Sequence, residues 1–274
     1  MTTKIGKKVI TKYLLPYLSQ SHLGRKPKVP LWRIVQAIIY KLKTGCQWRE
    51  LPMRPFSPKV SISCKTVFYH YNKWSQDGSL ARLWDALLGL HKSHLDLSCV
   101  QLDGSQTPAK RGGEAVGYQG RKKCKTTNAL FLTDNQGLPV AISMPVSGNH
   151  HDVFEVEKSL PKMLSDLQRA GIATEGLFMN ADAGFDCEKV QEICEQAEIF
   201  PNIKPNKRNT KETQMTDNHY IFDELLYTHR YCVERTNAWL DGFKNLALRY
   251  ETKNKNWLAW HFLAFSIILI RNNF

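Results

Sequence analysis

The sequence predicts an α/β fold, with a mixed sheet flanked by helices, preceded by a small all-α domain of the helix-turn-helix type. Residues 1–96 show apolar residues at helical spacing only, whereas residues 97–274 alternate short apolar runs with amphipathic stretches. The charge changes at the same point. Residues 1–96 hold 17 Lys and Arg against 4 Asp and Glu, and residues 97–274 hold 21 of each kind. We therefore expect one domain over 1–96 and a second over 97–274.

The N-terminal domain is expected to bind DNA, because the whole net charge of +13 lies in it. Helices are predicted over 5–17, 30–42, 63–75 and 80–91. The third helix would enter a groove, with Lys65, Thr66, Tyr69, His70 and Lys73 outward and Val67, Phe68, Tyr71 and Trp74 packed inward. A helical bundle with a charged surface and no DNA partner is the alternative.

The larger domain reads as a sheet with helices on both faces. Strands are predicted over 97–102, 128–134, 138–146, 176–181 and 199–203, and helices over 154–170, 187–197, 227–251 and 257–270. The residues Asp-Asn-Gln-Gly at 134–137 suit a hairpin turn. The order of elements predicts a sheet that begins antiparallel and finishes parallel.

Two carboxylates follow predicted strands, Asp103 after the first and Asp182 after the fourth. If these strands are neighbours, the carboxylates converge, and the helix over 227–251 could add Glu234. Carboxylate oxygens are the ligands that Mg²⁺ takes, and two ions about 4 Å apart would support phosphoryl transfer. Taken singly, each Asp is more often a turn or cap residue.

Other polar segments have two interpretations. The basic run at 120–125 is a candidate contact to the DNA backbone or a solvated loop; its cations are Arg121, Lys122, Lys123 and Lys125. Asp152 ends the run Asn-His-His-Asp at 149–152; it is interpreted as the cap of the helix over 154–170, with a contact to the active site as the alternative. Asp186 is interpreted as the cap of the helix over 187–197. The polar stretch over 204–211 is expected to lie near DNA.

Neither membrane association nor a disulfide framework is expected. The seven Cys show no CxxC spacing, which indicates a reducing compartment. The N-terminus lacks the apolar region of a signal peptide, and the longest apolar run, Phe262 to Ile270, is too short to span a bilayer.

The chain resembles the DDE-type transposases of bacterial insertion sequences, specifically the insertion-sequence-five group of the IS-four-like superfamily. The N-terminal resemblance rests on GRKPKVPLWRIVQAIIYKLKTGCQWRELP and TVFYHYNKWSQDG. In the larger domain it rests on LDGSQTPAKRGG, KTTNALFLTDNQGLPVAISMPVSGNHHD, NADAGFD and RYCVERTNAWLDGFKNLALRYE. These motifs follow one another over almost the whole chain.

The resemblance implies an RNase H-like fold and a catalytic triad of Asp103, Asp182 and Glu234 that holds Mg²⁺, in two ions, with Mn²⁺ as a substitute. Tyr227, Arg230 and Glu234 match the family signature Y-x2-R-x3-E. Arg230 is thus a candidate phosphate clamp, or an i,i+4 partner of Glu234. The Lys that completes the signature is replaced by Asp241, and Lys244 is the candidate substitute for its DNA contact.

The function implied is binding of insertion-sequence ends, followed by metal-dependent cleavage and transfer of DNA strands. The partners would be transposon ends, target DNA and at least one further subunit when the protein assembles on DNA. The expected location is the bacterial cytoplasm, at the nucleoid. Two alternatives remain: a catalytically inactive DNA-binding regulator, and an RNase H-like nuclease without strand transfer.

Overall fold

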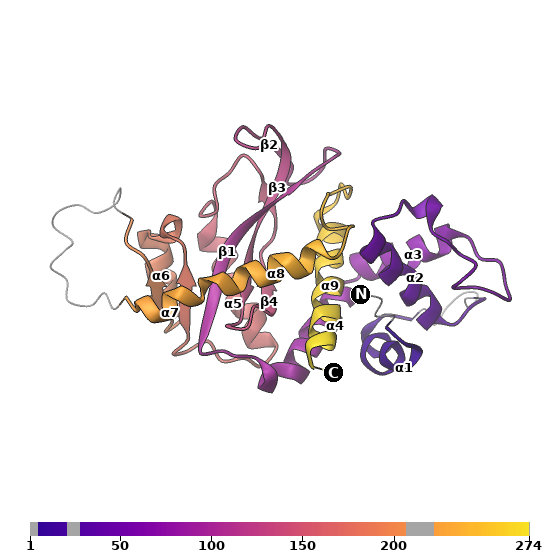
Figure 1. Ribbon diagram of the computed structural model, residues 1–274, viewed down its shortest axis with the longest axis horizontal. Helices are drawn as coiled ribbons and strands as arrows, with labels where there is room; N and C mark the ends of the chain where they lie inside the picture. Colours follow the sequence, from indigo (N-terminus) through magenta and orange to yellow (C-terminus); the bar gives the residue numbers. More distant parts are fainter. Residues whose placement is uncertain (1–4, 21–27, 207–221, 274) are drawn as a thin grey trace.

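The computed structural model describes residues 5–20, 28–206 and 222–273 (Figure 1). Residues 207–211 of the predicted polar loop lie outside them. A group of short helices from the N-terminal third lies at one end of the molecule, and a seven-stranded sheet with its own helices forms the rest.

The described part of the N-terminal third contains helices and no strand, as predicted. Its elements are α1 (Lys7–Val9), η1 (Ile10–Leu14), η2 (Leu15–Tyr17), α2 (Leu31–Thr44), η3 (Trp48–Glu50), α3 (Cys64–Gln76), α4 (Ser79–His91) and η4 (Lys92–His94). Val67, Tyr71 and Trp74 of α3 are buried, as their spacing indicates. The prediction that Phe68 points inward is wrong: it is 41% exposed and packs edge-on against Trp48, with ring centroids 5.3 Å apart.

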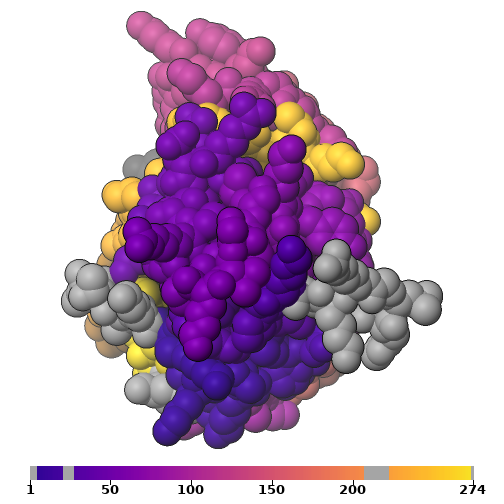
Figure 2. All heavy atoms as spheres, turned by 90° about the vertical axis from the view of Figure 1, so that its right-hand side faces the viewer, coloured from indigo at the N-terminus to yellow at the C-terminus, as the bar shows by residue number. Residues whose placement is uncertain are grey.

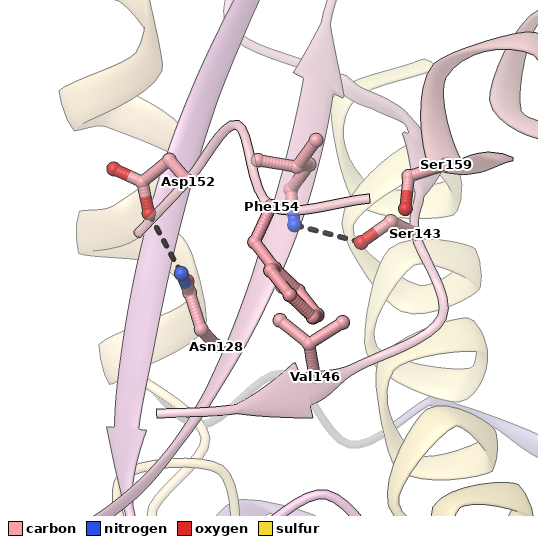
Figure 3. Close-up of a pocket in the computed structure, with 8 residues that line it drawn as sticks. Asn128, Ser143, Val146, Asp152, Phe154 and Ser159 are labelled. Atoms are coloured by element: carbon pink, nitrogen blue, oxygen red, sulfur yellow. Dashed lines mark hydrogen bonds between the residues drawn. The ribbon is translucent and has the colours of Figure 1, made fainter. Parts of the chain in front are cut away.

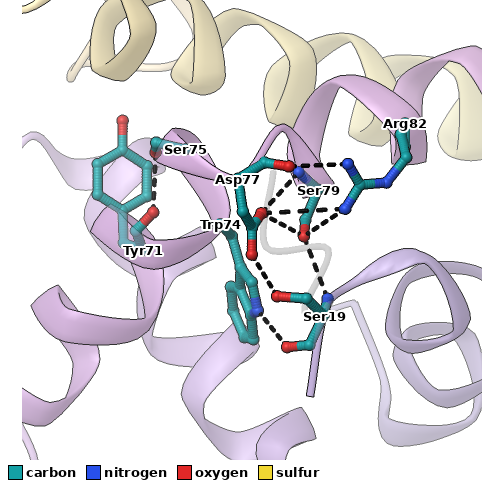
Figure 4. Close-up of polar contacts among 7 residues, drawn as sticks. All are labelled: Ser19, Tyr71, Trp74, Ser75, Asp77, Ser79 and Arg82. Carbon is teal, nitrogen blue, oxygen red and sulfur yellow. Dashed lines mark hydrogen bonds and ion pairs between the residues drawn. The ribbon is translucent and has the colours of Figure 1, made fainter. Parts of the chain in front are cut away.

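The turn between α3 and α4 is held by Asp77 (Figure 4). Its carboxylate accepts hydrogen bonds from the backbone N–H of Ser79 at 2.9 Å and from the hydroxyls of Ser79 and Ser19. Trp74 Nε1 donates to the carbonyl of Ser19 at 2.9 Å. Burial acts to raise the pKa of Asp77, but these hydrogen bonds hold it below its usual value. The network fixes α3 relative to α4 and to the preceding chain.

The sheet is mixed, with strand order β2-β3-β1-β6-β7 and with β4 and β5 also paired to β3. Its strands are β1 (Cys99–Pro108), β2 (Gly117–Gln119), β3 (Cys124–Thr133), β4 (Pro139–Ile142), β5 (Val146–Ser147), β6 (Phe178–Ala181) and β7 (Phe200–Ile203). β1, β2, β4 and β5 pair antiparallel with β3, whereas β6 lies parallel to β1 and β7 parallel to β6. This is the antiparallel beginning and parallel finish predicted, and it is the RNase H-like arrangement.

Helices cover both faces of the sheet. The helices are α5 (Val156–Arg169), α6 (Glu188–Gln196), α7 (Glu224–Thr228), η7 (His229–Tyr231), α8 (Cys232–Asp241) and α9 (Asn254–Asn273). α5 contacts β4 and α6, while α8 crosses β1 and β3 on the other side (Figure 1). α5 buries five apolar residues at helical spacing, which is why it packs against the sheet.

The last helix, α9, joins the two parts of the molecule. It packs against α2, α3 and α4 of the N-terminal third, and Phe265 contacts both Trp84 of α4 and Phe131 of β3, at centroid distances of 5.4 and 6.2 Å. The hydrophobic core is therefore continuous between the helical part and the sheet. The division of the chain at residue 96 stays a prediction. No helix of the described residues combines the length and the apolar character needed to cross a membrane.

The prediction of one long helix over 227–251 is wrong. A short 3₁₀ turn, η7, separates α7 from α8, and α8 ends at Asp241. The following segment makes hydrogen bonds to distant residues in place of helical ones: Asn245 N–H donates to Leu42 O at 3.1 Å, and Arg249 N–H to Pro108 O at 2.8 Å. The strand predicted over 138–146 is also divided, into β4 and β5, with Pro145 between them.

Candidate active site

Asp103 lies in β1, and Asp182 directly follows β6, the strand that pairs with β1. β1 and β6 pair in parallel with Gln101 opposite Asn180, and the Asn180 amide donates to Gln101 Oε1 at 2.9 Å. Because every second residue of a strand faces the same side, this register, continued by two residues, brings Asp103 and Asp182 next to each other on that face. The condition that the first and fourth predicted strands are neighbours is met, because β1 pairs with β6. Asp103, however, lies inside β1 rather than after its end.

The carboxyl group of Asp103 lies in an environment that disfavours its charge. Burial raises the pKa of Asp103 to about 6, while a hydrogen bond from the Gly104 backbone and the charge of Arg230 act to lower it. The charges of Asp182 and Asp152 raise it further. The negative charges of Asp182 and Asp152 therefore repel that of Asp103, and a cation bound at Asp103 would offset this repulsion.

Asp182 is the first residue after β6 and begins the 3₁₀ turn η5 (Ala183–Phe185). Its Oδ1 accepts the backbone N–H of Gly184 at 2.8 Å. A side chain at Gly184 would meet that oxygen at 2.9 Å. The small residue thus allows a carboxylate that is oriented by the backbone and still has its second oxygen available.

Arg230 supplies the positive charge of the site. It lies in η7, directly before α8, and its Nη1 donates to the hydroxyl of Tyr227 at 3.2 Å. The guanidinium carbon lies 5.5 Å from the centre of the Tyr227 ring. Because its charge lowers the pKa of Asp103, Arg230 lies on the acidic face of the sheet, where a phosphate would also sit.

Glu234 lies in the first turn of α8 and is exposed. It does not complete a cluster: within residues 5–20, 28–206 and 222–273, no three His, Cys, Asp or Glu side chains are close enough together to hold one metal ion. The structure therefore brings together two of the three predicted ligands. Glu234 lies on a helix that crosses the same strand.

The candidate DNA contacts lie in three places. Lys65, Thr66, His70 and Lys73 are on α3, where Lys65 is exposed and His70 packs on Trp74 at 5.2 Å. Burial, and then the charge of Lys73, lower the pKa of His70. Arg121, Lys122 and Lys123 form the turn between β2 and β3, and Lys125 follows in β3. This end of the sheet lies at the top of the molecule in Figure 1, and atoms of the same colour form the top of Figure 2.

Lys244 lies outside any helix, after the end of α8. Its side chain is exposed, and its backbone N–H donates to the carbonyl of Lys43 at the end of α2, at 3.2 Å. The prediction that Lys244 lies close to one turn beyond Asp241 on the same helix is therefore wrong, because α8 ends at Asp241.

The sequence interpretation of Asp152 and Asp186 as helix caps is wrong. α5 begins at Val156, and its N-cap position is Glu155, which has a left-handed backbone with φ of 54°. The Asp152 carboxylate instead accepts the amide of Asn128 at 2.7 Å. The N-cap of α6 is Cys187, while Asp186 accepts the backbone N–H of Asn206 at 2.7 Å. In each case a distant residue provides the hydrogen-bond donor.

The donors present fit a hard divalent cation. Asp103 and Asp182 provide only oxygen ligands, on adjacent strands, and mutual repulsion and burial destabilise the charge of Asp103. No thiol or imidazole belongs to a three-ligand group in the described part of the chain. The chemistry of this pair therefore suits Mg²⁺ or Mn²⁺ better than zinc.

Two family models match the chain. The model described as "Putative transposase of IS4/5 family" matches residues 8–84, and the model described as "Transposase DDE domain" matches residues 94–269. No curated protein matches the sequence.

Solved complexes of the Mos1 transposase are similar in outline. The "Crystal structure of a pre-cleavage Mos1 transpososome" is 12% identical, covers 93% of this chain and 82% of that chain, and has a TM-score of 0.31. The "Crystal structure of the Mos1 mariner paired end complex with Mn" is 11% identical over 97% and 87% of the two chains, with a TM-score of 0.30. Because the identities and TM-scores are this low, no role of a residue in this chain is inferred from these structures.

The two family models match the helical N-terminal third and the part of the chain that forms the sheet. The second model spans more than half of the chain and includes β1, β6 and α8, the elements that carry Asp103, Asp182 and Glu234. The first spans α2 and α3 of the basic N-terminal third. The chain therefore belongs to the DDE transposases, of the IS4/5 type.

Proposed function

We propose that the protein binds the ends of an insertion sequence and catalyses metal-dependent cleavage and transfer of DNA strands. The observation that supports this proposal is the parallel pairing of β1 with β6, because Asp103 lies in β1 and Asp182 directly follows β6, and the charges of Asp182 and Arg230 both act on Asp103. Family membership supports the same reaction class.

In this proposal, Asp103 and Asp182 hold divalent cations, Mg²⁺ or Mn²⁺, and Glu234 completes the ligand set when α8 or its side chain moves toward the pair. When bound, such ions lower the pKa of water and stabilise the charge that develops on a phosphodiester. Arg230 orients the phosphate through its planar, permanently charged guanidinium. Asp182 is held in orientation by Gly184, so its carboxylate loses little freedom when it binds a cation.

DNA would lie along the basic parts of the protein. Lys65, Thr66, His70 and Lys73 of α3 would contact the transposon end, as recognition helices do. The tip of the β2–β3 hairpin would contact the backbone of the same or the target duplex through Arg121, Lys122, Lys123 and Lys125. Lys244 is exposed and would contact DNA near the junction of the two parts.

We also propose assembly of two or more subunits on DNA, because two ends are joined to one target. The reaction would take place in the bacterial cytoplasm, at the nucleoid, where the substrate DNA is.

The test is incubation of the purified protein with duplexes carrying the element's own ends, with Mg²⁺ or Mn²⁺, and sizing of the products on a denaturing gel. Wild type is expected to give nicked ends and joined products, and Asp182→Asn to bind ends and give neither. Asp186→Asn, four residues along, is the matched control and should keep cleavage. Binding without cleavage by wild type would favour the inactive regulator, and cleavage without joining would favour the nuclease.

A further inference from the structure

Asp152 lies against the backbone of Gly104, the residue that follows Asp103 in β1. A methyl group built on Gly104 would come within 2.3 Å of both the carboxyl carbon and Oδ1 of Asp152. No side chain fits there while Asp152 keeps its position. The glycine thus allows a second carboxylate to approach β1 at the level of Asp103.

The two carboxylates reach β1 from opposite faces of the sheet. Side chains alternate along a strand, so Gly104 shares its face with its cross-strand partner Leu130, while Asp103 faces the side of α8. A cavity of about 10 Å³ on the Leu130 side is lined by Asp152 and by Ser159 of α5 (Figure 3). The strand backbone therefore lies between Asp152 and Asp103, and Asp152 is placed behind the site.

Asp152 is held in place by a single polar contact from a buried partner. Asn128 is 1% exposed, and its Nδ2 donates to Asp152 Oδ1 at 2.7 Å (Figure 3). Within the described residues, no Lys, Arg or His forms an ion pair with Asp152. Its negative charge therefore has no cationic partner among the described residues, and it lies against the backbone of Gly104, the residue next to Asp103.

We propose that Asp152 is a positioning residue of the active site: its unpaired charge, held behind β1 by Asn128, strengthens the binding of divalent cations by Asp103 and Asp182 without contacting them. A fixed negative charge on the other side of the strand backbone attracts a divalent cation through the protein interior, where screening is weaker than in water. The inference rests on the proposed function, because it assumes that the Asp103–Asp182 pair binds metal.

The experiment measures Mn²⁺ binding to the full-length protein without DNA, by electron paramagnetic resonance of the free ion. Asp152→Asn removes the charge and keeps an oxygen that can accept the Asn128 amide. It is expected to weaken Mn²⁺ binding about 10-fold, because the attraction between the Asp152 charge and a cation held by Asp103 is lost. Its thermal midpoint without metal should stay within about 3 °C of wild type, since the hydrogen bond remains.

Glu155→Gln is the matched control. It removes one negative charge three residues away on the same loop, but the Glu155 carboxylate is already paired with Lys158 at 2.5 Å, so Mn²⁺ affinity should not change. Asp152→Ser, which also removes the charge and keeps an acceptor, is used in addition in case the Asn variant folds poorly.

The outcomes separate the inference from the proposed function. Wild-type affinity in both Asp152 variants, with binding lost in Asp103→Asn, overturns the role of Asp152 and leaves the metal site intact. Absence of saturable Mn²⁺ binding by wild type overturns the metal site itself, and the inference with it. A loss of affinity in Glu155→Gln equal to that in Asp152→Asn shows a general charge effect and also overturns the inference.

Discussion

Lys41 of α2 donates a hydrogen bond of 2.7 Å to the side-chain oxygen of Asn245, which lies in the segment after α8. The ammonium also donates to the carbonyl of Cys46 at 3.0 Å and lies over the rings of Trp48 and Trp260, at 5.0 and 5.5 Å. The basic N-terminal third is thus joined to the chain that leaves the helix of Glu234. These contacts couple the position of α2 to that of the segment after α8.

Lys41→Met is expected to destabilise the protein by about 1–3 kcal/mol, because the buried Asn245 oxygen and the half-buried Cys46 carbonyl lose their donor. Burial lowers the pKa of Lys41, with the charge of Glu251 acting in the opposite direction, so removal of a costly charge offsets part of the loss. Urea unfolding measures the change. Lys65→Met, at an exposed position of α3, should change the free energy of unfolding by less than about 0.5 kcal/mol. Equal stability of the two variants would show that the Lys41 contacts contribute nothing.

The parts of the fold that depend on nearby residues were predictable. The turn 134–137 forms as expected, because Asp134 accepts the backbone N–H groups of Gln136 and Leu138 at 3.0 and 2.7 Å. The sequence also indicated that Asp103 and Asp182 would converge if the first and fourth predicted strands were neighbours, and β1 does pair with β6.

Features that depend on distant partners were not predictable. The apolar spacing over 227–251 is helical, but Gly242 follows the last residue of α8 and the next residues bond to Leu42 and Pro108. Asp152 precedes a helix, which favours a cap, yet its partner Asn128 is 24 residues away. The Gly that follows Asp103 was the one local sign that another group approaches β1 there.

Arg230→Lys is expected to lower the rate of end cleavage about 100-fold while leaving end binding within about twofold, because lysine keeps the charge and loses the planar fork that orients a phosphate. Single-turnover cleavage and a binding titration measure the two quantities. Arg235→Lys is the control: Arg235 lies on the same helix region but donates to Gln136 O at 2.8 Å. A similar loss in both variants would indicate damage to α8 rather than a role for Arg230.

His261 makes the protein sensitive to acid. It is 2% exposed in α9, and burial lowers its pKa to about 4, with a hydrogen bond to Trp257 opposing and the charge of Arg249 adding to the shift. Because the unfolded chain takes up this proton near pH 6.5 and the folded protein does not, the stability is complete above that pH and falls as the pH drops toward 4. Between pH 7.5 and 5.0 the loss from this residue is about 2 kcal/mol.

His261→Phe should remove that part of the acid sensitivity, whatever its effect on stability at pH 7.5, and urea unfolding at the two pH values measures the difference. His151→Phe, at an exposed position, should keep the wild-type difference. An unchanged difference in His261→Phe would mean that other groups cause the acid sensitivity.

Binding to insertion-sequence ends is expected to weaken steeply with salt, because the cations of α3 release counterions from the DNA backbone. Each phosphate contact contributes about 0.9 to the slope of log K against log salt concentration. Lys65→Gln and Lys73→Gln should therefore each reduce the slope by about 1. Lys158→Gln is the control, because Lys158 lies on α5 and pairs with Glu155 at 2.5 Å, so its removal should leave the slope unchanged. Fluorescence anisotropy from 50 to 300 mM salt measures the slopes, and equal slopes for all three variants would place the DNA away from α3.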